Sequence, residues 1–203
     1  MTTAQSSPTL AIDESAADVL FRDGHTAYSF TDERVSDAQL AEIYELTRHA
    51  PTAMNSQPLR VLFARTPEAK ARLLPLLAEG NRAKAESAPV VAILAADTDF
   101  HEKLPTLLPM SPNARDSFSD SDKRIAHARF NATLQAGYFI LAVRAVGLDA
   151  GPMGGFDAAG VDEEFFAGTP LRSLLVVNIG HVADGGNFPR KPHVTFDEAV
   201  TLL

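Results

Sequence analysis

The chain has 203 residues and a mass of 21.8 kDa, with 45% hydrophobic and 22% charged residues, which is the composition of one globular domain. Its formal net charge is −8 and no cluster of Lys and Arg is present, which excludes a duplex nucleic-acid binder. The absence of cysteine excludes thiol catalysis, disulfides and Cys-based metal centres. No run is apolar enough to cross a bilayer and residues 1–15 lack the pattern of a secretory signal, so we expect a cytoplasmic protein.

The first half of the chain predicts helices that alternate with strands. Residues 1–9 are polar and predict a flexible N-terminal tail. From residue 10, apolar residues recur at helical spacing to about Phe21. Ser36 and Gln39 form a capping box at the start of a helix that must end before Pro51. The pattern then predicts a strand at 60–64, a helix begun by Thr66 and Pro67, a short polar helix at 80–88 and a covered strand at 89–96.

The second half contains a proline-rich excursion and one long helix. Residues 97–121 are irregular, which predicts a lid or a surface excursion. A helix over 122–146 would span about 37 Å, and its second half is apolar nearly all round, so we expect it to be central and buried. The segment at 148–153 leads into a turn, after which we expect a helix from Asp157 to about Phe166 and a buried strand at 172–179. A basic loop at 183–193 and a last helix capped by Thr195 and Glu198 end the chain. This alternation predicts a single α/β domain over 10–203.

The sequence has none of the familiar hydrolase, kinase or metalloprotease motifs, and its six histidines show no metal-ligand spacing, so we expect no metal site. The segment 50–60, APTAMNSQPLR, carries the most chemistry. Two prolines bracket Thr52, Asn55, Ser56 and Gln57, whose amide and hydroxyl groups suit the polar edge of a heterocycle. The alternative is a capped turn in which the Asn and Gln side chains bond to their own backbone.

This segment resembles the signature P-[ST]-x-x-N-x-Q-P of the nitroreductase family of FMN-dependent oxidoreductases, which residues 51–58 match. The resemblance continues over residues 10–203, through Asn81 and Lys84, the long helix with the turn that follows it, and the strand at 172–180. It implies an α/β (α+β) fold with a mixed central sheet flanked by helices. It also implies an intertwined homodimer with FMN at the interface.

The resemblance further implies roles for single residues. Thr52, Ala53 and Asn55 would lie along the ribityl chain and ring, and Asn81 would hydrogen-bond the pyrimidine edge. Lys84 would stabilise negative charge on the reduced flavin, whereas its alternative is a solvated charge on a helix face. The glycines after the long helix would let the backbone approach the flavin closely, although many nitroreductases have Glu at the position of Gly154. The implied cofactor-binding residues are Thr52, Ala53, Asn55, Gln57, Asn81, Lys84, Pro152, Met153, Gly154, Gly155, Arg190, His25 and His193.

The phosphate end departs from the family pattern, which has an R-x-S-x-R-like run after the first helix and an Arg near the C-terminus. This chain has His25, Thr26 and Tyr28 at the first place and His193 at the second, with Arg190 and Lys191 just before it. Imidazole is a weaker anchor for a phosphate dianion than guanidinium. We therefore expect looser phosphate binding than the family pattern gives, with Arg190 as its main anchor.

The resemblance implies an enzyme that takes hydride from NADH or NADPH through FMN to a small electrophile, with Lys84 in support and no dedicated acid–base residue. The stretches 102–118 and 165–180 and the GPMGGFD turn resemble the malonic semialdehyde reductase group, which forms 3-hydroxypropionate. One alternative is a general nitro or quinone reductase, because flavins reduce such acceptors readily. The other is a flavin-free dimeric scaffold or small-molecule binder, because the expected arginines are missing.

Overall fold

The computed structural model describes residues 10–203, so the predicted tail at 1–9 lies outside the described residues. Its centre is a four-stranded sheet in the order β1-β2-β4-β3. The strands are β1 (Leu59–Ala64), β2 (Val90–Asp97), β3 (Asp149–Met153) and β4 (Leu171–Gly180). The α/β class expected from the sequence is confirmed. One detail differs, because all three strand pairs are antiparallel rather than mixed. The connections from β1 to β2 and from β3 to β4 return the chain to the end of the sheet at which the preceding strand ended. The connection from β2 to β3, which contains α6, instead crosses to the opposite end, because both strands are antiparallel to β4.

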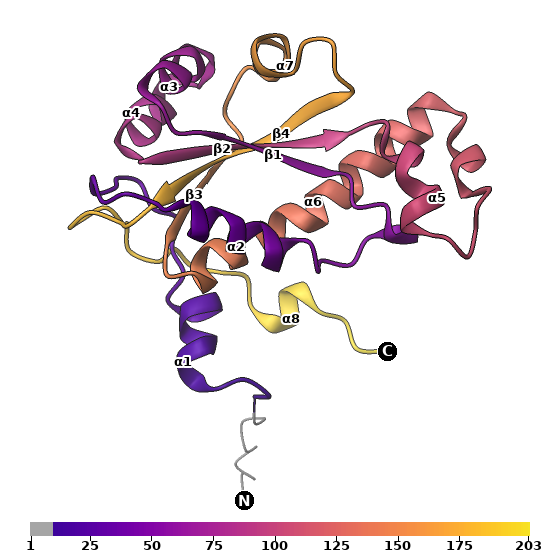
Figure 1. Cartoon of the computed structure of the whole chain (residues 1–203). Coiled ribbons are helices and arrows are strands. Elements are labelled where there is room, and N and C mark those ends of the chain that lie inside the picture. Colours follow the sequence, from indigo (N-terminus) through magenta and orange to yellow (C-terminus); the bar gives the residue numbers. More distant parts are fainter. Residues whose placement is uncertain (1–9) are drawn as a thin grey trace, which may run out of the picture.

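Helices cover both faces of the sheet (Figure 1). One face carries α2 (Asp37–Thr47) and α6 (Ser121–Ala145), and the other carries α3 (Pro67–Leu73), α4 (Glu79–Ser87) and α7 (Ala158–Phe166). Two hydrophobic cores result, one on each face. Strand β2 is buried at every position because it lies inside the sheet with helices above and below. The long helix α6 agrees with the prediction in place and length.

Three segments differ from the sequence predictions. The predicted first helix is divided into α1 (Glu14–Ala17) and a π-helical turn at Asp18–Arg22. The excursion at 97–121 contains α5 (Leu104–Leu107) and 3-10 turns at Phe100–Lys103 and Ala114–Phe118. Strand β3 was not predicted, because Gly and Pro are depleted in strands, but an edge strand tolerates both. Short 3-10 turns at Ala53–Asn55 and Leu74–Leu76 and helix α8 (Phe196–Ala199) complete the described elements.

The sheet register separates two of the segments singled out in the sequence. Leu59, which directly follows the turn at 51–58, lies opposite Ala96 at the last residues of β2. Helix α4 instead leads into the first residues of β2, where Val90 lies opposite Ile179. The turn and α4 are therefore at opposite ends of the sheet. None of the helices within residues 10–203 is long and apolar enough to span a membrane.

Candidate functional site

The predicted residues Asn81 and Lys84 lie together on α4. They are three residues apart, which places their side chains on one helix face. The Asn81 amide Nδ2 donates to the carbonyl oxygen of Gly155 at 3.0 Å, and the Lys84 ammonium donates to Asn81 Oδ1 at 3.1 Å. The Ala78 N–H donates to the same Gly155 carbonyl at 3.0 Å. The start of α4 is thus tied to the glycine turn that follows β3.

The glycine turn has one glycine that packing requires and one that faces open space. A Cβ at Gly155 would lie 3.0 Å from Asn81 Nδ2 and 3.3 Å from the Cβ of Ala78, so a side chain there would displace the Asn81 amide. A Cβ at Gly154 would meet nothing within 4 Å. Met153 is buried, and its sulfur receives the Asn178 amide at 3.6 Å. The exposed backbone at 154–155, rather than the Met153 side chain, therefore offers a surface that a flat ring could approach.

Tyr28 connects α4 with the C-terminal segment. The Lys84 ammonium lies 4.7 Å from the centroid of the Tyr28 ring, within the range of a cation–π contact. The other side of Tyr28 packs edge-on against Phe188, with the two ring centroids 4.5 Å apart. The Tyr28 N–H donates to the carbonyl of Gly186 at 2.8 Å, which fixes the backbone of both segments. The side chains from Asn81 to Tyr28 thus form one line of contacts.

This line ends at a cavity of about 250 Å³, which we call the cationic pocket. Arg190 donates to the carbonyls of Arg22 and of Gly24, the latter at 3.3 Å, and Arg144 donates to the Leu20 carbonyl at 2.9 Å. Both guanidinium groups are thereby held by the same short stretch of backbone. Burial lowers the pKa of Arg144, the nearby Asp149 carboxylate partly opposes this, and the positive charge of Arg190 adds to the lowering. The lining residues are Gly24, His25, Thr26, Tyr28, Arg144, Phe188, Pro189, Arg190, Lys191 and His193.

His25, Arg190 and His193 line the same pocket, and Arg144, which the sequence analysis missed, lines it with them. Arg144 belongs to the last turn of α6, far in sequence from the other cations of the pocket. Its one sequence signal is a single charge within the apolar run AGYFILAVRAVG. A Cβ at Gly24 would clash with the guanidinium carbon of Arg144, so a side chain there would displace the guanidinium. Two guanidinium groups in a small polar cavity have the chemistry that a phosphate requires.

The turn before β1 uses most of its side-chain amides within the chain. Gln57 Nε2 donates to Asn55 Oδ1 at 2.7 Å, and Asn55 Nδ2 donates to the Leu107 carbonyl at 2.9 Å. Thr52 Oγ1 accepts the Gln57 N–H at 3.2 Å. Neither amide bonds to the backbone of the turn itself, so these bonds differ from the capped-turn alternative, although they occupy both side-chain amide groups within the chain. The Gln57 backbone carbonyl accepts from Arg60 at 3.0 Å, whereas within residues 10–203 the side-chain oxygen Oε1 of Gln57 accepts no hydrogen bond. This Oε1 and the Thr52 hydroxyl proton are therefore free for a ligand.

One chain does not bring all the predicted site residues together. The turn at 51–58 contacts α5 through the bond from Asn55 to Leu107, whereas α4 carries Asn81 and Lys84. Figure 1 shows α4 and α5 at opposite ends of the sheet. No hydrogen bond within the described part of the chain joins the turn to Asn81, to Lys84 or to the cationic pocket.

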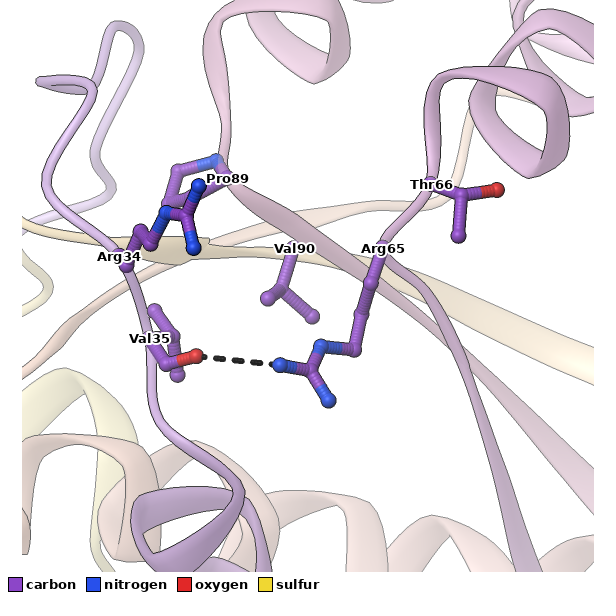
Figure 2. Close-up of a pocket in the computed structure, with 6 residues that line it drawn as sticks. All are labelled: Arg34, Val35, Arg65, Thr66, Pro89 and Val90. Carbon is purple, nitrogen blue, oxygen red and sulfur yellow. Dashed lines mark hydrogen bonds between the residues drawn. The ribbon is translucent and has the colours of Figure 1, made fainter.

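Another hollow, of about 420 Å³, lies between the end of β1 and the loop before α2 (Figure 2). Arg65 points across it toward the Val35 carbonyl, to which its Nη2 donates at 3.4 Å. Arg65 also pairs with Asp37, so its charge is already compensated. None of the predicted site residues lines this hollow, so it is not a candidate for the site. Over the described residues no group of three or more His, Asp or Glu is placed to hold a metal ion.

Comparisons with known proteins identify the family of this chain. Residues 22–181 match the family described as the nitroreductase family. A Streptomyces coelicolor protein named "Putative NADH dehydrogenase/NAD(P)H nitroreductase" is 55% identical over 196 residues, which cover 96% of this chain and 97% of that protein. The chain belongs to the nitroreductase family, and the family resemblance seen in the sequence is confirmed.

Two solved structures share the fold at low identity. A "putative nitroreductase in complex with FMN" from Exiguobacterium sibiricum has a TM-score of 0.81 and 19% identity, and the match covers 97% of this chain and all of that one. A "putative NAD(P)H:FMN oxidoreductase" from Staphylococcus epidermidis has a TM-score of 0.81 and 16% identity, over 98% of this chain and all of that one. These likenesses extend the agreement to the arrangement of the helices and strands.

Proposed function

We propose that the chain is an NAD(P)H-dependent oxidoreductase that uses FMN. The observation that carries this proposal is the line of contacts from the Gly155 carbonyl through Asn81, Lys84 and Tyr28 to the cationic pocket. It presents amide, ammonium and aromatic groups at one end and guanidinium groups at the other. A flavin ring and a phosphate, joined by a flexible chain, need the same succession of groups. The names of the family relatives support this assignment.

The residues present fit the cofactor at both ends. Asn81 and Lys84 would hold the polar edge of the ring, beside the open backbone at Gly154. Arg144 and Arg190 would hold the phosphate, with His25 and His193 beside them. The cationic pocket favours a flavin-bound protein over a flavin-free scaffold, because cations gathered in one pocket repel each other less when an anion lies between them. FMN, when bound, accepts a hydride from NADH or NADPH and passes it to the acceptor.

Lys84 supplies the electrostatic part of the reaction. Its ammonium is held by Asn81 Oδ1 and by the face of Tyr28, so it is fixed before any ligand arrives. A fixed cation beside the ring lowers the free energy of states in which the ring region gains negative charge. We assign no general acid or base, since positioning and electrostatics are sufficient for hydride transfer.

We further propose a homodimer with FMN at the interface. Phe130, Leu134 and Tyr138 lie along one face of α6 and are 65%, 43% and 42% exposed. Apolar residues of this size in a continuous stripe normally pack against another surface. The turn at 51–58 is also exposed at Ala53 and Asn55 but lies apart from Lys84 within one chain. A second copy that packs on α6 would add its turn to the site and complete it.

For the acceptor we propose malonic semialdehyde, which would give 3-hydroxypropionate. The support is the sequence resemblance of 102–118, 165–180 and the GPMGGFD turn to that group of reductases. The second candidate is a nitro or quinone reductase, which the name of the 55% identical relative favours. The use of NAD(P)H fits the cytoplasmic location expected from the sequence.

Anaerobic half-reactions test the proposal and rank the acceptors. Purified protein loaded with FMN should lose its flavin absorbance when NADH or NADPH is added, and malonic semialdehyde or a nitroaromatic should then restore it. Faster return with malonic semialdehyde supports the aldehyde, and faster return with the nitroaromatic supports the second candidate. Protein that neither binds FMN nor loses its absorbance with either nucleotide would contradict the proposed function.

A further inference from the structure

Helix α6 carries three polar side chains that face the turn before β1. His127, Asn131 and Gln135 are spaced four residues apart, so they lie on one face of the helix, and we call them the polar ladder. Asn131 Oδ1 accepts the Ala53 N–H at 2.7 Å, and Gln135 Oε1 accepts the Leu59 N–H at 3.0 Å. The ladder therefore bonds to the backbone at both ends of the segment 53–59.

His127 anchors the middle of the same segment. Its Nε2 lies 3.2 Å from the hydroxyl of Ser56, which is buried. Its ring is parallel to that of Phe100, with centroids 4.9 Å apart, and meets the Phe118 ring edge-on at 4.8 Å. These two rings come from the excursion at 97–121 and fix the orientation of the imidazole. The ladder thus joins the turn to α6 and to the excursion.

The ladder occupies positions where apolar residues would otherwise pack. Asn131 is 1% exposed and Gln135 4%, and the neighbouring Ala128, Ala132 and Ala136 are all buried. Burying an amide is unfavourable unless its polar atoms are bonded. Asn131 meets this requirement twice, since its Nδ2 also donates to the His127 carbonyl at 2.9 Å. The small alanines let the turn approach the helix closely enough for these bonds.

The turn before β1 needs this support because its backbone conformation is unfavourable. Met54, Asn55 and Gln57 have φ values of 58°, 50° and 41°, in the left-handed region that residues with a Cβ rarely adopt. Strained backbone of this kind persists only where the surroundings impose it, and it gathers at ligand-binding segments. The ladder supplies fixed acceptors for the N–H groups of Ala53 and Leu59, on either side of the strained residues.

We propose that His127, Asn131 and Gln135 are positioning residues, which fix the segment 53–59 in the one conformation that contacts FMN. This inference rests on the proposed function, because it assigns that segment to the flavin site. The ladder residues do not themselves touch the cofactor. They act through the turn, so their removal should weaken and reorient bound flavin even though the rest of the fold persists.

The test compares two substitutions at one position. Asn131→Leu keeps the size of the side chain but removes the acceptor for Ala53, whereas Asn131→Asp keeps an acceptor at the same place. Thr169→Val is the matched control, since Thr169 Oγ1 also bonds to backbone, at 2.7 Å from the Phe166 carbonyl, but lies near α7. Three quantities are measured for each: the exchange rate of the Ala53 amide proton in protein without flavin, the Kd for FMN, and the visible circular dichroism of bound flavin.

We expect Asn131→Leu to expose the Ala53 amide to exchange, to raise the Kd for FMN about tenfold or more and to change the flavin dichroism. Asn131→Asp should restore most of the amide protection, the FMN affinity and the flavin dichroism, and Thr169→Val should resemble wild type in all three. Unchanged Kd and dichroism in folded Asn131→Leu would overturn the inference. Should that variant not fold, His127→Phe replaces it, because it keeps the ring contacts and loses the Ser56 bond. Wild-type protein that binds no FMN would refute the proposed function. If wild type binds FMN and folded Asn131→Leu binds it equally well, only the positioning role of the polar ladder is refuted.

Discussion

Arg144 and Arg190 line the same cationic pocket, and both donate hydrogen bonds to the backbone between Leu20 and Gly24. Burial lowers the pKa of Arg144, the Asp149 carboxylate raises it, and the charge of Arg190 lowers it, because the two guanidinium groups are close enough to repel each other. An anion between them would remove this repulsion and use the remaining donors. The pocket is therefore better suited to a phosphate dianion than the histidines at 25 and 193 suggest by themselves.

Arg144→Gln should weaken FMN binding about tenfold or more, because a fixed cation at the phosphate is lost. The same change should hardly affect riboflavin, which has no phosphate. Titration of the protein with both flavins measures the two affinities, and Arg72→Gln, an exposed arginine paired with Glu164 on the α3 side, is the control. An equal loss for both flavins would mean that Arg144 supports the fold rather than the phosphate.

Lys84→Met should slow the loss of flavin absorbance on addition of NADH about tenfold or more, with a smaller effect on the Kd for FMN. The reason is that the ammonium would stabilise the negative charge of the reduced ring, a state absent when the oxidised cofactor binds. Rapid mixing measures the rate and titration measures the Kd, with Lys123→Met as an exposed control. A variant that loses FMN but whose remaining holoenzyme reacts at the normal rate would contradict this role.

Local signals in the sequence predicted most of the fold. The capping box of Ser36 and Gln39, the Thr66 cap and the Asp157 cap all form as expected, because each depends on residues a few positions apart. The continuous apolar run at 89–96 predicted a covered strand, and the fully buried β2 (Val90–Asp97) follows it within one residue at each end. Strand β3 could not be predicted from its own residues, since Gly151 and Pro152 are in a strand only because β4 lies beside them.

The site was predictable where its residues are close in sequence and not where they are far apart. Asn81 and Lys84 share one helix face by spacing alone. Arg144 joins His193 only through the fold, and nothing near Arg144 in the sequence indicates a phosphate. The hydrogen bond from the Ala53 N–H to Asn131 was likewise not predictable. The apolar pattern of α6 predicts a buried helix, but it does not indicate which groups its polar side chains contact. Spacing predicts a helix face; the tertiary fold decides its partner.

The stability of the protein should fall in mild acid in a way that depends on His127. Burial lowers the pKa of this imidazole, and the hydrogen bond to the Ala53 backbone only partly opposes the effect. Above pH about 6.5, the reference value for histidine, both folded and unfolded states are neutral at this position. As the pH falls below that value the unfolded chain gains a proton that the folded chain resists, so the free energy of unfolding decreases.

His127→Gln should therefore show a smaller decrease in the free energy of unfolding between pH 7.5 and pH 5 than wild type does. Urea unfolding at several pH values measures it, and His49→Gln, at an exposed histidine just after the end of α2, is the control. Parallel curves for wild type and His127→Gln would show that another group causes the acid sensitivity.

The exposed face of α6 should be the contact between two copies of the chain. Sedimentation of wild type at micromolar concentration should give twice the 21.8 kDa of one chain. Phe130→Asp with Leu134→Asp should give 21.8 kDa, because two carboxylates on each copy cannot be buried against each other. Met110→Asp is the control, since Met110 is equally apolar and 90% exposed but lies in the excursion at 97–121.

This double substitution should also lose FMN, although neither residue belongs to the line of contacts from Gly155 to the cationic pocket. The reason is that a monomer keeps Asn81, Lys84 and Arg144 but lacks the turn that a second copy would add. Absorbance of bound flavin and far-ultraviolet dichroism, measured on the same sample, separate this loss from unfolding. A folded monomer that binds FMN as tightly as wild type would show that one chain completes the site alone, and the turn at 51–58 would then need another role.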